Sequence, residues 1–262
     1  MKALYIASTG MAAQERNVEI ISNNIANMRT TGFKRQRAEF QDLLYQQYAR
    51  AGASTSDSGT TAPVGIEVGS GVKTAATPRV MSQGTVNPTE KDLDLAVSGE
   101  GYFAIQLPDG RTGYTRDGSF DRSPNGLLVN VDGYQVQPGI TIPDNANSIS
   151  ISADGIVQAY VGTSTTPTQL GQLQLYRFVN PSGLESVGDN NFVETAASGA
   201  AQAGTPNSDG MGHLMQGYLE QANVNPVTEI ADLIAAQRAY EMNAKVISAA
   251  DQMLQSTSNM FR

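Results

Sequence analysis

The sequence predicts an α+β fold in which helices at the two ends of the chain pack together and short antiparallel strands fill the middle. Apolar residues recur every seven residues at both ends, which is typical of helices that bury one stripe. In the middle, turn dipeptides recur between alternating apolar residues, which is typical of short strands. We therefore expect a terminal helical domain of residues 1–33 and 218–262, an extended connecting segment over 34–71, and a β-rich domain over 72–217.

The first helix is predicted from a seven-residue apolar repeat that spans about 28 residues. The Asn-rich stretch Asn23–Asn27 and Gly32 let the chain bend away at the end of this helix. The repeat consists of Leu4, Met11, Val18 and Ile25, flanked by Ala7, Ile21 and Met28.

The second helix is predicted from Pro226 to about Asn259. Asn225 can cap the exposed amide groups at its start, and a proline at the first helical position loses nothing through its missing N–H. Apolar pairs at 246/247, 253/254 and 260/261 make the stripe too wide for one helical partner, so other copies of the chain are needed to cover it. The seven-residue row consists of Leu233, Tyr240, Ile247, Leu254 and Phe261.

The middle of the chain is interpreted as a β-meander. Four turn dipeptides follow one another at intervals of eight, eight and seven residues, the spacing of short strands joined by tight turns. They are Asp109-Gly110, Asp117-Gly118, Asn125-Gly126 and Asp132-Gly133.

Alternating apolar residues mark the strands of this region, and small polar residues mark two loops. The loops are expected at Ala51–Pro63 and Thr195–Gly212. The alternating sets are Leu93, Leu95 and Val97, then Phe103, Ile105 and Leu107, then Leu127, Val129 and Val131. Further strands are expected at Ile149–Ile151, Ile156–Val161 and Leu170–Phe178.

The composition argues against several classes of function. With 17 Lys and Arg against 25 Asp and Glu, the net charge of −8 disfavours a nucleic-acid partner. The absence of Cys removes thiolate chemistry and disulfides, and His213 is the one imidazole left for a metal. No apolar run is long enough to insert into a membrane, and the first residues do not read as a secretory signal. Any transport out of the cytoplasm is therefore expected to use another route.

Enzyme-like motifs are weak. Asp117–Ser119 has the wrong order for an aspartic protease. His213 is expected in a Gly-rich loop, and the sequence contains no Gly-x-Ser-x-Gly elbow to supply a serine nucleophile. Gly99–Gly101 lacks the third glycine of a dinucleotide cradle and is expected to form a bend instead. Asp92 and Asp94 are expected on the exposed face of a strand, with too few carboxylates nearby for calcium. We expect no catalysis, no cofactor and no metal.

Motifs at both ends carry a resemblance to a known family. The chain resembles bacterial flagellar rod and hook proteins, and it is most similar to the distal-rod members. It departs from their usual pattern at Gln221-Ala222 and Pro226, where the second helix begins. The shared end motifs are Ser22–Asn27, Thr30–Lys34, Asn223–Asn225, Glu229-Ile230, Leu233-Ile234 and Gln237–Glu241, and those similar to the distal rod are Thr9–Met11, Gly32–Arg37, Tyr114–Phe120 and Gln135–Pro138.

The resemblance implies a structural subunit of the flagellar basal-body distal rod, a rigid self-assembling helical tube that transmits torque from motor to hook and surrounds the export channel. It implies that the terminal helices form the inner layer and the β-rich domain the outer layer. It also implies type III export without cleavage into a rod that spans the periplasm. The implied partners are further copies of the chain, other rod subunits, hook subunits, ring proteins and the export apparatus, with no nucleic acid and no direct membrane insertion.

Assembly contacts are expected along both helices and their connections. Asn17 and Asn24, seven residues apart, are expected to be solvated or near a helix end, and the second interpretation is that they fix the register between copies as buried asparagines do in coiled coils. Shortening Ala51–Pro63 is expected to alter the rod before it alters monomer folding. The candidate interface residues are Leu4, Met11, Val18, Ile21, Asn24, Ile25, Asn27, Gly32, Phe33, Asn223, Asn225, Leu233, Gln237, Tyr240, Ile247, Leu254 and Phe261.

Two alternatives to the distal rod stay open at this point. One is a proximal rod or hook subunit of the same family. The other is a secreted β-rich adhesin or carbohydrate-binding module, which should be a stable monomer that binds glycans and forms no filaments.

Overall fold

The computed structural model describes residues 2–53, 62–162, 166–208 and 210–260. These residues form two compact units, each built from separate stretches of sequence. The first unit contains the described residues within 1–25, 36–78 and 226–262, and the second contains those within 26–35 and 79–225. The domain limits expected from the sequence stay a prediction.

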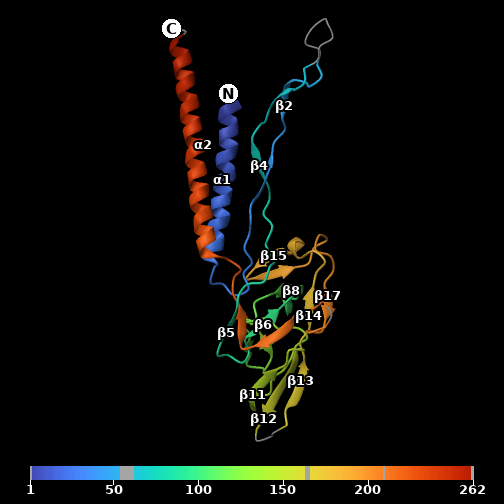
Figure 1. Ribbon diagram of the computed structural model, residues 1–262. Coiled ribbons are helices and arrows are strands. Elements are labelled where there is room, and N and C mark those ends of the chain that lie inside the picture. The colour runs from blue at the N-terminus through green and yellow to red at the C-terminus, as the bar shows by residue number, and fades with distance from the viewer. Residues whose placement is uncertain (1, 54–61, 163–165, 209, 261–262) are drawn as a thin grey trace. The chain divides into compact units, whose positions relative to one another are not determined.

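Both terminal helices form, and the α+β fold class is confirmed. Helix α1 spans Lys2–Ala26 and helix α2 spans Pro226–Met260, so α2 begins at the expected proline. The two helices lie side by side in the first unit (Figure 1). They approach closely at Gly10, where an added Cβ would lie 3.0 Å from the side-chain Nδ2 of Asn243. No helix within the described stretches is long and apolar enough to cross a membrane.

A two-stranded ribbon completes the first unit. Strand β1 (Glu39–Asp42) pairs antiparallel with β4 (Val72–Ala76), and β2 (Gln46–Ala49) pairs antiparallel with β3 (Ile66–Val68). Lys2 holds the start of α1 to the ribbon, because its Nζ donates to Gln46 Oε1 at 3.0 Å and to the Val68 carbonyl at 3.1 Å. Most of the expected loop Ala51–Pro63 lies outside the described residues.

The second unit consists of short strands and one 3₁₀ turn. Its largest sheet has four strands in the order β15-β16-β8-β7, and β11, β12 and β13 form a three-stranded meander. The strands are β5 (Val86–Pro88), β6 (Leu95–Ser98), β7 (Phe103–Gln106), β8 (Thr112–Thr115), β9 (Asp121–Arg122), β10 (Leu128–Val129), β11 (Ala146–Ile151), β12 (Ile156–Val161), β13 (Thr168–Gln172), β14 (Leu175–Arg177), β15 (Glu185–Gly188), β16 (Asn191–Val193), β17 (Gln202–Gly204), β18 (His213–Gln216) and β19 (Tyr218–Glu220), with the turn at Pro181–Gly183.

The predicted β-meander is interrupted: β7 pairs with β8 and β9 with β10 as expected, but β8 pairs with β16 and not with β9. Strand β6 pairs with β18, and β5 pairs with β19, so the last strands of the unit return to its first ones. Because both pairings join residues more than a hundred positions apart, local turn signals could not reveal them. The unit therefore closes on itself through its C-terminal strands.

Strand β7 lies between two apolar cores because its two faces are both buried. Phe103 and Ile105 point into the larger core, whereas Tyr102 and Ala104 point into a second core rich in aromatic residues. A strand that is apolar on both faces is typical of the centre of a packed unit.

Several local expectations are corrected. Asp117-Gly118 forms no hairpin turn, because the Gly118 carbonyl accepts a hydrogen bond from Leu95 and a Cβ there would lie 1.6 Å from the Leu95 oxygen. Leu170–Phe178 is divided between β13 and β14, which belong to different sheets. The expected loop Thr195–Gly212 contains β17.

Four single positions also differ from expectation. Asp94 is buried instead of lying on an exposed strand face, and its backbone bridges to Ser119. Leu93 precedes strand β6, and Val131 follows β10 in a turn. His213 begins strand β18, with an exposed side chain, and does not lie in a loop.

Candidate assembly surface

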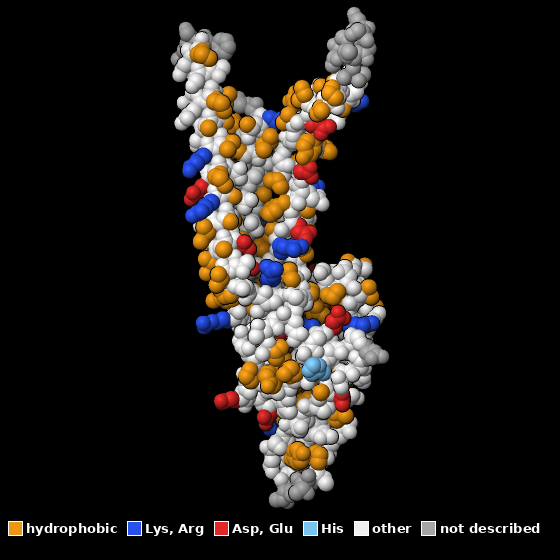
Figure 2. Space-filling model, viewed as in Figure 1, with side chains coloured by type: hydrophobic (Ala, Val, Ile, Leu, Met, Phe, Trp, Pro, Cys, Tyr) orange, Lys and Arg blue, Asp and Glu red, His pale blue; other side chains and the backbone are white. Residues whose placement is uncertain are grey.

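Helix α2 carries apolar side chains that its own chain leaves uncovered. Figure 2 shows hydrophobic side chains along the helical unit, many of them facing outwards. Met242 is 61% exposed and Tyr240 is 44% exposed. Soluble monomers rarely leave such a row open to water. The exposed large apolar residues of α2 are Val227, Ile230, Ile234, Tyr240, Met242, Val246, Met253, Leu254 and Met260.

The cause lies in the amphipathic pattern of α2. Ala236 and Ala250 are buried, and Leu233 and Ile247 are half-buried. The other apolar residues project around the rest of the circumference, where α1 cannot reach them. Leu254 is 37% exposed and Gln237 is exposed. Phe261, the last residue of the expected row, lies outside the described residues.

The expected row on α1 is only partly covered. Leu4, Met11, Val18 and Ile25 are half-buried, whereas Ile21 is buried. The row therefore lies at the border between the helix interface and solvent.

A groove runs between helices α1 and α2. Its volume is about 590 Å³. Helix α1 contributes Val18 and Ser22 to the lining together with two glutamates, and α2 contributes Gln237 and Tyr240 together with a third. The glutamates are Glu15, Glu19 and Glu241. The groove thus combines an apolar lining with carboxylates.

Asn24 links α1 to other parts of its own unit. Its Nδ2 donates to the Gln36 carbonyl at 2.8 Å and to Glu229 Oε2 at 3.1 Å, and its Oδ1 accepts a hydrogen bond from the Gln36 N–H at 2.9 Å. Both Asn24 and Glu229 are buried. The side chain therefore joins the base of α1 to the first turn of α2 within one chain.

The ribbon adds a second exposed apolar region. Leu44 is 88% exposed although it is a large apolar residue. Aromatic side chains accompany it, and the Lys2 ammonium lies 5.8 Å from the centre of the Tyr48 ring. The exposed large apolar residues of the ribbon are Phe40, Leu44, Tyr45, Tyr48, Val64, Ile66 and Val68.

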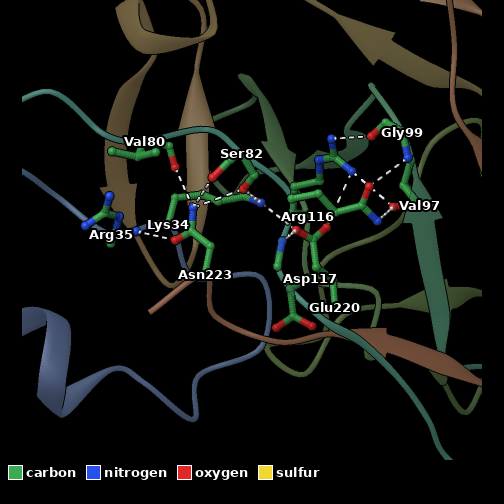
Figure 3. Close-up of polar contacts among 12 residues, drawn as sticks. Lys34, Arg35, Val80, Ser82, Val97, Gly99, Arg116, Asp117, Glu220 and Asn223 are labelled. Atoms are coloured by element: carbon green, nitrogen blue, oxygen red, sulfur yellow. Dashed lines mark hydrogen bonds and ion pairs between the residues drawn. The ribbon is translucent and has the colours of Figure 1, made fainter. Parts of the chain in front are cut away.

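A buried polar network lies in the second unit and includes the segment that follows α1 and the segment that precedes α2 (Figure 3). Lys34 Nζ donates to Glu220 Oε1 at 2.5 Å and to the Ser82 carbonyl at 2.9 Å. Arg116 Nη1 lies 3.4 Å from Glu220 Oε2, so one carboxylate faces two cations. Burial lowers the pKa of Lys34, Glu220 opposes this effect, and Arg116 adds to it.

The same network gathers three of the expected residues. The Gly32 N–H donates to the Glu220 carbonyl at 2.8 Å, and the Asn223 N–H donates to the Phe33 carbonyl at 3.4 Å. Asn223 Oδ1 also accepts a hydrogen bond from the Arg35 N–H at 2.8 Å. Gly32, Phe33 and Asn223 therefore hold together the two stretches of sequence that form the second unit, residues 26–35 and 79–225.

Asn27 and Asn225, the other two expected asparagines, lie next to the two helices. Asn27 Oδ1 accepts a hydrogen bond from the Thr30 hydroxyl at 3.2 Å, and Asn225 is exposed immediately before α2.

The sequence interpretation missed two kinds of residue, buried charges and an exposed apolar side chain of α2. Lys34 was recognised only as part of a motif, and Glu220 was not singled out, since charged residues are normally exposed. Met242 was not singled out because it lies outside the seven-residue row, although Val246 and Met253 on the same flank of α2 belong to the apolar pairs that widen the predicted stripe. Among the described residues, no group of three or more His, Cys, Asp or Glu side chains could hold a metal.

Family models match three stretches of the chain. Residues 4–34 match a model described as flagella basal body rod protein. Residues 96–159 match the D1 domain of the flagellar hook protein FlgE/F/G, and residues 215–260 match the C-terminal part of the flagellar basal body rod FlgEFG protein. The first and last stretches cover the two helices.

Individual relatives match over the whole length. The chain is 56% identical to the flagellar basal-body rod protein FlgG of Caulobacter vibrioides over 260 residues, which is 99% of each chain. It is 48% identical to FlgG of Borreliella burgdorferi over 264 residues, which is 100% of this chain and 99% of the relative. It is 34% identical to the rod protein FlgF of Caulobacter vibrioides over 258 residues, which is 97% of this chain and 95% of the relative.

Proposed function

The chain belongs to the flagellar hook and basal-body rod protein family as a structural subunit of the distal rod, and we propose that it works by polymerising through its terminal helices into a rigid tube. Its identity is 56% to a FlgG protein against 34% to a FlgF protein of the same organism, which favours the distal rod over the other rod positions. The similarity to rod proteins over the full length argues against the alternative of an adhesin or carbohydrate-binding module.

The observation that carries this proposal is the uncovered apolar surface of α2. At about 25 cal/mol per Å² of apolar area removed from water, covering such a surface stabilises an assembly. Neighbouring copies provide the missing cover, because each copy brings the same helices. The helices of all copies then form the inner layer around the export channel, and the strand-rich unit forms the outer layer.

Torque transmission follows from close packing. Interfaces packed to the density of a protein interior have low compressibility, so a tube of this kind twists little under load. The ribbon formed by β1–β4 offers further apolar contacts to neighbours, with Leu44 and Val64 as its most exposed large apolar side chains. We assign the chain no catalytic role.

Export precedes assembly in this proposal. The chain passes through the flagellar type III apparatus and folds in the rod, inside the rings, between its rod and hook neighbours. The absence of Cys suits this route, because an unfolded chain outside the cytoplasm then cannot form wrong disulfides.

Complementation tests the proposal. The gene replaces the distal-rod gene of a flagellated host, and basal bodies are isolated and viewed by electron microscopy. We expect complete rods that carry hooks, and motile cells. A matched pair of variants probes the surface: Met242→Glu should stop rod growth, whereas Thr168→Glu, at an exposed position in the other unit, should not. Motile cells with complete rods from Met242→Glu contradict the proposed role of α2.

A further inference from the structure

We propose that the groove between α1 and α2 receives the opposite side of α2 from a second copy of this chain, in a head-to-tail contact repeated along the assembly. This inference rests on the proposed function and names the contact that drives it. Such a contact requires two complementary faces on the same molecule. The charges and apolar residues of the first unit provide them.

The groove has an excess of negative charge. Glu15, Glu19 and Glu241 line it, and the one ion pair among the described residues here joins Glu19 to Arg16 at 2.6 Å. Val18 and Tyr240 supply the apolar part of the lining. The partner surface should therefore be apolar and carry cations at its edge.

The opposite side of α2 has these properties. With about 100° between successive helical residues, Met242, Val246 and Met253 lie roughly opposite Gln237 and Tyr240. All three are exposed, and methionine side chains adapt well to a groove of irregular shape. We call this surface the methionine ridge.

Two cations border the methionine ridge. Arg238 precedes Met242 by four residues and Lys245 follows it by three, so both lie on the same surface as Met242. Neither cation forms an ion pair with any residue that the structure describes. They are thus available to the groove glutamates of another copy.

The geometry also fits an open polymer. The groove and the methionine ridge lie on different sides of one helix, so a copy that uses its ridge keeps its groove free for the next copy. Such heterologous contacts produce rings or open helices, whereas a contact between identical patches ends at a dimer.

Charge reversal at the two faces tests the contact in basal bodies. We expect Glu15→Lys to lower the number of complete rods per cell about tenfold, because an attractive pair becomes repulsive. Lys245→Glu should have a similar effect. Combining both reversals restores attraction and should return the number to within about threefold of the unchanged protein. Both residues are exposed, so the thermal unfolding of each purified variant should match that of the unchanged protein.

Engineered cysteines provide a direct readout, since the chain has none of its own. Val18→Cys combined with Met242→Cys should give a ladder of disulfide-linked chains after oxidation of isolated rods. Val18→Cys combined with Ser248→Cys is the matched control, because Ser248 is exposed away from the methionine ridge, and it should stay monomeric.

The outcomes separate this inference from the proposed function. If the unchanged chain never enters basal bodies, the proposed function fails. If the unchanged chain builds rods, three results overturn the inference. They are a normal number of complete rods from Glu15→Lys, a double variant of Glu15→Lys and Lys245→Glu that does not restore the number, and the absence of the disulfide ladder.

Discussion

Lys34 Nζ donates to Glu220 Oε1 at 2.5 Å, and both side chains are fully buried although 186 residues separate them in the sequence. Arg116 approaches the same carboxylate, so two cations share one anion. Removing the anion should therefore cost more than removing one cation. Buried ions without a partner are strongly destabilising.

This asymmetry predicts unequal effects of two substitutions. Glu220→Gln leaves Lys34 and Arg116 without a counterion and should lower the free energy of unfolding by about 3–5 kcal/mol. Lys34→Met leaves the pair of Arg116 and Glu220 and should lower it by about 1–3 kcal/mol. Urea unfolding of the purified chain at neutral pH measures both values. Equal losses, or a larger loss for Lys34→Met, contradict the charge assignment.

We expect the folded chain to lose stability at high pH because of Tyr114. Burial, followed by the charge of Glu194 and the neighbouring Tyr176, raises the pKa of Tyr114 to about 12. Between its ordinary pKa of about 10 and 12 the folded chain keeps a proton that the unfolded chain releases, so stability falls as the pH rises through this window. The full effect is about 2–3 kcal/mol.

Tyr114→Phe is the matched test of this prediction, since it keeps the ring and removes the titrating hydroxyl. Urea unfolding at pH 9 and pH 11 should show a smaller decrease for Tyr114→Phe than for the unchanged chain. Tyr102, whose pKa burial also raises, contributes equally to both proteins. Identical decreases would show that Tyr114 ionises as an exposed tyrosine does.

Asn24→Ala should loosen the base of the helical unit. The substitution leaves the backbone N–H and carbonyl of Gln36 and the carboxylate of Glu229 without this partner. We expect a loss of about 1–3 kcal/mol in the free energy of unfolding. Ser22→Ala, at an exposed position of the same helix, is the control and should change it by less than about 0.5 kcal/mol. Hydrogen exchange at the last turn of α1 locates the effect, and unchanged exchange in Asn24→Ala would refute the predicted link.

Gly32→Ala should disrupt the second unit. The φ angle of Gly32 is +69°, and an added Cβ would lie 2.7 Å from the backbone nitrogen of Asp117. Gly133 also has a positive φ, of +85°, but a Cβ there meets nothing within 4 Å. Gly133→Ala therefore carries the backbone strain alone, about 1 kcal/mol, and Gly32→Ala should cost at least about 2 kcal/mol more. Thermal unfolding compares the two, and similar losses would mean that the close approach to Asp117 has no energetic weight.

The sequence predicted the helices well because their signal is local. Pro226 marks the start of α2, and the seven-residue rows extend along both helices. The strand pairings could not be predicted in the same way. His213 pairs with Ser98, and the turn dipeptides between them contain no information about that partner. The predicted turns were correct where the chain forms hairpins, as at Asn125-Gly126 between β9 and β10.

The candidate site was predicted in part for the same reason. The apolar rows pointed to the helices, and the structure adds the exposed flank around Met242. Buried charges such as Lys34 and Asp94 escaped, because a charged residue is expected at the surface unless its partner is known. That partner lies far away in the sequence for Lys34.

Limited proteolysis, read by mass spectrometry, shows whether neighbouring copies cover the terminal helices in the rod. The dilute purified chain and isolated rods are digested under the same conditions. We expect rapid cleavage within about the first 40 and last 40 residues of the free chain around a resistant middle, and protection of the same residues in rods. Full protection of both ends in a dilute monomer would contradict this expectation, because the helices would then need no neighbour.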